Sequence, residues 1–109
     1  MLESKFQSGL IKELKERFPG CIVMKNDATQ IQGIPDLTVL YGDKWAALEC
    51  KRDEADVQKS QKRGNQPYYV KRMDEMSFAR YIYPQNKKEV LDELELALKP
   101  NRETCPVQS

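Results

Sequence analysis

The chain has no histidine, only three cysteines and no long run of apolar residues. Without histidine, zinc-hydrolase motifs, Ser-His-Asp and Cys-His catalysis, and most imidazole acid–base chemistry are excluded. The cysteines are odd in number and far apart, without metal-ligand spacing, which argues against a disulfide framework. No apolar segment approaches the roughly 20 residues that cross a bilayer. If the protein is an enzyme, carboxylates, lysines and a hard cation must do the work.

The bulk composition predicts one soluble domain inside the cell. At 109 residues, with 39% hydrophobic and 32% charged residues, the chain fits a globular domain with a modest core. Its start, MLESKFQSGLIKELKERF, lacks the apolar stretch and cleavage site of a signal peptide. The net charge of +1 gives no global attraction to nucleic acid, so such binding needs a local patch. We expect an intracellular domain over residues 1–100 and a disordered tail over 101–109.

The hydrophobic pattern predicts an α/β fold with the element order αβββαβα. The expected elements are a helix over 2–18, strands over 21–25, 37–41 and 45–51, a helix from Asn65, a strand over 78–83 and a helix capped by Asn86. Tyr69, Met73 and Met76 should give the apolar face of the second helix. Residues 52–64 are polar and without a clear period, which predicts a mobile loop. The expected architecture is a small mixed sheet flanked by helices.

Two carboxylates, Asp36 and Glu49, lie in a segment that otherwise has the pattern of a buried hairpin. Gly42-Asp43 suits a two-residue type II′ turn, and a turn there places Asp36 opposite Glu49. Side chains alternate between the two faces of a strand, so Glu49 and Lys51 point the same way, as does Asp36. Charges are rarely placed in a core without a partner, so this cluster calls for an explanation.

A divalent cation would relieve the repulsion between two opposed carboxylates, whose Cβ atoms lie about 4.5–5.5 Å apart. Oxygen ligation favours Mg²⁺ or Mn²⁺, and the carbonyl of Cys50 can reach the same side. The metal lowers the pKa of a bound water and neutralises charge on the phosphorane, which suits phosphodiester hydrolysis. Lys51 would orient the water or contact the phosphate. The structural alternative is an ordinary hairpin with edge charges.

The pattern GIPDL…ALECKR…NQPYYVKRM resembles the stand-alone virus-type replication-repair nuclease (VRR-NUC) domain of the PD-(D/E)xK nuclease superfamily. Pro35-Asp36 looks like the PD, and Glu49-Cys50-Lys51 like the (D/E)xK. The resemblance implies a restriction-endonuclease-like αβββαβα core and a Mg²⁺- or Mn²⁺-dependent endonuclease acting on branched DNA. Holliday-junction resolution or flap-type DNA repair is the expected activity. It also implies a bacteriophage- or bacterium-encoded protein in the cytoplasm of a bacterial host.

The resemblance adds a helix acid and a glutamine to the candidate site. The first helix offers three acids, Glu3, Glu13 and Glu16. We favour Glu3 as a catalytic residue and metal ligand, because it falls on the centre of the apolar stripe, whereas Glu13 lies at its flank. The superfamily's glutamine matches Gln66 at the start of the second helix, with Gln61 and Gln58 as rivals.

Basic residues after the hairpin form the candidate DNA contact, namely Arg52, Lys59, Lys62 and Arg63. They can follow a phosphate backbone through contacts that carry little sequence information. A solvated charged loop is the equal alternative. Asn26 and Thr29, in the loop before the hairpin, are further candidates for DNA contact.

Aromatic and methionine side chains between Tyr68 and Tyr83 predict a homodimer, because one small sheet cannot cover them all. Resolving a four-way junction takes two nicks on opposing strands, which a two-fold dimer supplies. The tyrosines of this segment could stack on unpaired bases, but core or interface positions are favoured. A non-catalytic DNA-binding or protein-interaction module is the alternative function, and the intact Asp36, Glu49 and Lys51 argue against it.

Overall fold

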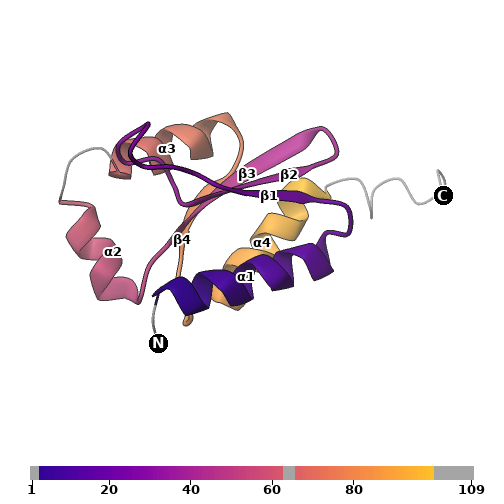
Figure 1. Ribbon diagram of the computed structural model, residues 1–109, viewed down its shortest axis with the longest axis horizontal. Coiled ribbons are helices and arrows are strands. Elements are labelled where there is room, and N and C mark those ends of the chain that lie inside the picture. Colours follow the sequence, from indigo (N-terminus) through magenta and orange to yellow (C-terminus); the bar gives the residue numbers. More distant parts are fainter. Residues whose placement is uncertain (1–2, 63–65, 100–109) are drawn as a thin grey trace.

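The computed structural model describes residues 3–62 and 66–99. Its elements are α1 (Glu3–Arg17), β1 (Ile22–Lys25), β2 (Leu37–Tyr41), β3 (Lys44–Cys50), α2 (Glu54–Ser60), α3 (Gln66–Met76), β4 (Ala79–Ile82) and α4 (Lys87–Leu98). The strands form one sheet in the order β1-β2-β3-β4, antiparallel except for the parallel pair β3–β4. Helices α1 and α4 lie on one side of the sheet and α3 on the other (Figure 1). The predicted α/β class, with a small mixed sheet flanked by helices, is confirmed, whereas the expected tail lies outside the described residues.

Helix α1 is held to the sheet by an apolar residue on every fourth position. Phe6, Leu10, Leu14 and Phe18 are buried in the main core, as the spacing predicts for one face of a helix. The helix ends before Pro19-Gly20, where Gly20 has a φ of 89° that side chains rarely adopt. This turn sends the chain into β1 at the edge of the sheet. Within the described ranges, no helix is long and apolar enough to span a lipid bilayer.

The hairpin of β2 and β3 has the predicted register. Leu37 pairs with Leu48, and Tyr41 pairs with Lys44, so Gly42 and Asp43 form the two-residue turn. Gly42 has a φ of 63°, and no described non-glycine residue has a positive φ, which fits a type II′ turn. The alternation of β3 sends its even-numbered side chains into the core under α1 and α4 and its odd-numbered ones toward α3.

The expected mobile loop over residues 52–64 was wrong, because Glu54–Ser60 form helix α2. The Asp53 side chain caps this helix by accepting a hydrogen bond from the Asp56 backbone N–H at 2.9 Å. Only Val57 is buried in it, and a single apolar residue creates no helical period in the sequence. Residues 63 and 64, which complete the predicted loop, lie outside the described residues.

Helix α3 begins at Gln66 with Pro67 in its first turn, as predicted, whereas the expected cap Asn65 lies outside the described residues. Val70 and Met73 pack toward the sheet in a small cluster with Ala47 and Ala79. Met76 was wrongly placed on the buried face: it is the last residue of the helix and is 61% exposed.

Helix α4 buries the predicted face against the sheet, namely Val90, Leu91, Leu94 and Leu98. The side chain of Asn86 does not cap it as expected. Instead, Asn86 accepts a hydrogen bond from the Tyr83 N–H at 2.8 Å and donates one to the Tyr81 carbonyl at 3.1 Å. The side chain therefore stabilises the turn that leaves β4 rather than the helix that follows it.

Candidate functional site

Asp36, Glu49 and Lys51 meet at the end of the hairpin that is remote from its turn. Asp36 immediately precedes β2, opposite Glu49 near the end of β3, as the register predicts. The Asp36 N–H donates to Glu49 Oε1 at 2.9 Å, and the Cys50 N–H donates to Asp36 Oδ2, also at 2.9 Å. Lys51 Nζ lies 3.4 Å from Glu49 Oε2. Each carboxylate is thus fixed by the backbone of the opposite segment.

The backbone of this site is held from both neighbouring strands. Asn26, directly after β1, donates from Nδ2 to the Pro35 carbonyl at 2.9 Å and to Thr38 Oγ1 at 2.8 Å. Its N–H donates to the Asp36 carbonyl at 2.8 Å. On the other side, the Lys51 N–H donates to the Ile82 carbonyl of β4 at 2.9 Å. The Asn26 side chain thus anchors the segment that carries Asp36, and its contact with DNA stays a prediction.

Burial shifts the proton equilibria of the two carboxylates. Glu49 is 3% exposed and Lys51 is 9% exposed. Burial, followed by the nearby charge of Asp36, raises the pKa of Glu49 to about 8, although Lys51 opposes the shift. Burial also raises the pKa of Asp36, against the hydrogen bond from Cys50 and the charge of Lys51. The pair therefore retains a proton near neutral pH, and a bound cation would displace it.

The donor set fits a hard divalent cation of the Mg²⁺ type. Such ions are held in proteins through one or two carboxylates together with water, and the adjacent Asp36 and Glu49 supply that number. No group of three or more acidic, cysteine or histidine side chains suited to a metal occurs within residues 3–62 and 66–99. The Cys50 side chain is buried in the main core, on the opposite face from Glu49, as predicted. Its carbonyl as a ligand stays a prediction.

The helix acid is not settled by the described side chains. Glu3 opens α1, but its side chain lies outside the described residues. Of its rivals, Glu13 forms an ion pair at 2.9 Å between its Oε1 and Lys87 Nζ, and Glu16 is exposed. Glu13 is therefore engaged with the start of α4, and Glu3 stays the predicted acid.

The predicted glutamine and DNA contacts are placed only in part. Gln66 opens α3, and its side chain, like all of Arg63, lies outside the described residues. Its rivals are both exposed: Gln58 lies in α2, and Gln61 directly follows that helix. The remaining predicted contacts, Arg52, Lys59 and Lys62, are also exposed on or beside this helix. Helix α2 therefore presents basic side chains directly after the catalytic candidates, and their contact with DNA stays a prediction.

Tyr81 is a neighbour of the site that sequence reasoning did not select. It pairs with Glu49 in the parallel ladder of β3 and β4, so both side chains lie on the α3 face of the sheet. Its hydroxyl oxygen is buried and has no hydrogen-bond partner among the residues that the structure describes. Burial and the charge of Glu49 raise its pKa further above 10. Alternation with Ala79 predicts its face, but only the fold shows that the hydroxyl lacks a partner.

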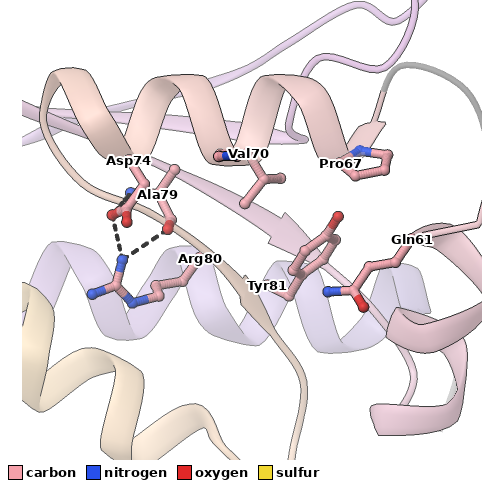
Figure 2. Close-up of a pocket in the computed structure, with 8 residues that line it drawn as sticks. Gln61, Pro67, Val70, Asp74, Ala79, Arg80 and Tyr81 are labelled. Carbon is pink, nitrogen blue, oxygen red and sulfur yellow. Dashed lines mark hydrogen bonds and ion pairs between the residues drawn. The ribbon is translucent and has the colours of Figure 1, made fainter.

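A pocket of about 490 Å³ lies beside this tyrosine, between α3, β4 and the end of α2. Its lining residues are Gln61, Pro67, Val70, Lys71, Asp74, Ala79, Arg80 and Tyr81. Figure 2 shows Pro67 and Val70 above the Tyr81 ring, with Gln61 at one end and the ion pair of Asp74 and Arg80 at the other. The apolar walls thus lie between two polar ends.

No family model, no curated protein and no solved structure matches this chain.

Proposed function

We propose that the protein is a metal-dependent DNA endonuclease that hydrolyses phosphodiester bonds. The observation that supports it is the hydrogen-bonded pair of the half-buried Asp36 and the buried Glu49, with the buried Lys51 against Glu49. Two adjacent carboxyl groups and a lysine at a site this removed from water cost free energy that apolar residues would not. A carboxyl group whose pKa is strongly shifted beside a specific charged partner, as for Glu49, is typical of functional sites. The resemblance of these residues to the VRR-NUC pattern gives the chemistry its most specific interpretation.

The residues of the site have separate roles in this proposal. Asp36 and Glu49 would hold Mg²⁺ or Mn²⁺, which, when bound, supplies an activated water and neutralises negative charge on the reacting phosphate. Lys51 is held beside Glu49 at 3.4 Å and would donate a hydrogen bond to a phosphate oxygen or to the attacking water. The Cys50 N–H keeps the Asp36 carboxylate oriented. Glu3 and Gln66 are proposed to complete the site from the first turns of α1 and α3.

The substrate and assembly are proposed from the resemblance and from the surface. Branched DNA, such as a Holliday junction or a flap in DNA repair, is the proposed substrate in a phage- or bacterium-encoded, intracellular enzyme. Arg52, Lys59 and Lys62 are exposed beside the site and suit phosphate contacts. A homodimer is supported by large exposed apolar side chains, namely Ile22, Met24, Ile31, Tyr68 and Met76.

Cleavage of synthetic four-way junctions and flaps in Mn²⁺, with and without EDTA, tests this proposal. Asp36→Asn should lower the cleavage rate by orders of magnitude, because cation positioning and charge neutralisation are lost together. Lys51→Ala should abolish cleavage while leaving Mn²⁺ binding nearly intact. Asp43→Asn and Lys44→Ala are matched controls, because both lie in the same hairpin at its opposite, exposed end.

Both controls should cut at the wild-type rate. If Asp36→Asn cuts branched DNA as fast as the wild type, the pair is not the catalytic metal site. If the wild type binds these DNAs but leaves them uncut in Mn²⁺, the alternative of a non-catalytic DNA-binding module is correct.

A further inference from the structure

The Tyr81 side chain has a donor that the described protein does not use. Its hydroxyl is buried without a hydrogen-bond partner, although buried polar groups are paired in the great majority of cases. Glu49 lies beside it in the ladder, on the same face of the sheet. The residue also lines a pocket, so its unused donor is a candidate hydrogen-bond partner for a ligand next to the candidate catalytic carboxylates.

The side chains that line the pocket beside Tyr81 suit a flat, neutral ligand with hydrogen-bonding groups along its edge. Pro67, Val70 and Ala79 supply apolar surface, and the Tyr81 ring supplies an aromatic wall. Its volume of about 490 Å³ falls within the range of small-ligand sites. Gln61, at one end, carries an amide that can both donate and accept hydrogen bonds. Figure 2 shows the Gln61 amide directed toward the Tyr81 ring.

An anionic group suits this pocket less well than a neutral one. Asp74 lines one end, and its carboxylate already binds Arg80. Arg80 also bonds Glu93 and lies 4.2 Å from the centre of the Phe78 ring, so its guanidinium is engaged. Lys71 is the other cation of the lining. A phosphate here would lie near the carboxylate of Asp74, which would repel it.

We propose that this pocket binds the base of an unpaired nucleotide that flanks the scissile phosphate. The proposal rests on the proposed nuclease function, because it is the candidate catalytic cluster that places DNA beside Tyr81. The base would lie against the Tyr81 ring and the apolar wall of α3, and its polar edge would receive hydrogen bonds from the Tyr81 hydroxyl and the Gln61 amide. Unpaired nucleotides next to the cut would then be a requirement for the substrate.

Binding of uncharged deoxyribonucleosides to the metal-free protein tests the pocket without any cleavage. Methyl signals of Val70 and Ala79 are followed by NMR during titration with deoxythymidine and deoxyadenosine. Deoxyribose without a base is the matched ligand control. We expect saturable shifts of both methyl groups with the nucleosides and none with the sugar.

Tyr81→Phe removes only the hydroxyl and should weaken nucleoside binding roughly three- to tenfold, as expected for the loss of one hydrogen bond. Tyr83→Phe, two residues further along the chain and outside the pocket lining, should bind as the wild type does. In cleavage assays, replacing the unpaired nucleotide beside the cut by an abasic residue should lower kcat/KM in the wild type at least as much as Tyr81→Phe does.

Three results would overturn the pocket proposal. These are the absence of shifts at Val70 and Ala79, equal shifts with deoxyribose, and unchanged nucleoside affinity in Tyr81→Phe. None of them bears on whether Asp36 and Glu49 support cleavage. Conversely, nucleoside binding by a protein that leaves all DNA uncut would retain the pocket and reject the nuclease.

Discussion

The metal-free protein should become less stable as pH rises, because the raised pKa of Glu49 lets the folded state hold a proton that is lost at higher pH. The pKa of Glu49 is raised from 4.5 to about 8, chiefly by burial and then by the charge of Asp36. Between these values the folded protein holds a proton that the unfolded chain has released. Stability then falls with rising pH, because the folded state binds more protons than the unfolded state. The stabilising effect of the proton is fully present below about pH 4.5 and is lost as pH rises through about 8.

The size of this effect follows from the shift. One pH unit changes the free energy of unfolding by about 1.4 kcal/mol for one proton. Between pH 4.5 and about pH 8, the loss of stability therefore amounts to about 5 kcal/mol. Typical domains unfold at a cost of about 5–15 kcal/mol, so the loss is a large part of the total. The raised pKa of Asp36 acts in the same direction at lower pH. Tyr81, which faces Glu49, has its pKa raised above 10 and does not titrate in this interval.

Urea denaturation in EDTA at pH 5.5, 6.5 and 7.5 measures the slope. The free energy of unfolding of the wild type should fall by about 1.4 kcal/mol per pH unit. Glu49→Gln keeps an oxygen that can accept the Asp36 N–H and removes the ionisable group, so its slope should be close to zero. At pH 7.5 this variant should be more stable than the wild type by as much as about 4 kcal/mol. Glu16→Gln, an exposed site on α1, should retain the wild-type slope.

Saturating Mn²⁺ should reverse the trend, because a cation binds the ionised pair and stabilises the folded state by mass action. The wild type should then become more stable as pH rises, whereas Glu49→Gln should gain little. The reasoning is refuted if wild-type stability is flat between pH 5.5 and 7.5 in EDTA, or if Glu49→Gln keeps the wild-type slope.

Two further predictions concern DNA contact and assembly. The double variant Lys59→Ala and Lys62→Ala should reduce the salt dependence of DNA binding, because each residue is expected to neutralise one phosphate. The magnitude of the negative slope of log K against log salt concentration should decrease by about 2 in anisotropy titrations. An unchanged slope would remove both residues from the interface. Light scattering at micromolar concentration should give twice the chain mass, and a monomer mass both with and without DNA would contradict the proposed homodimer.

The hairpin register was predictable because two local rules agree on it. Gly42-Asp43 fixes the turn, and strand alternation then assigns every side chain of β3 to a face. The apolar faces of α1 and α4 were predictable for the same kind of reason, since the buried residues of each helix follow helical spacing. These features depend on neighbours a few residues apart, which the sequence displays directly.

The features that escaped prediction depend on contacts between distant segments. Helix α2 has one buried residue, Val57, and its start is marked only by the Asp53 cap. Asn26 bonds Pro35 and Thr38 across the β1–β2 connection, which residue type alone does not reveal. The unpaired hydroxyl of Tyr81 becomes visible only when β4 is placed beside β3. Strand alternation in a sequence can indicate that a tyrosine is half-buried. It does not indicate whether the hydroxyl of that tyrosine has a hydrogen-bond partner.

The position of the cluster in the sheet bears on the two interpretations of its charges. An ordinary hairpin with edge charges would place Asp36 and Glu49 at a solvated border. Strand β3 is instead paired on both sides, by β2 and β4, and Glu49 is 3% exposed. A buried ion pair adds little net stability and is often replaceable by apolar residues of similar volume. The second carboxylate makes stability an even weaker explanation, because its repulsion is part of what raises the pKa of Glu49. An arrangement that destabilises the metal-free fold near neutral pH, and that a cation would relieve, favours a role in binding that cation.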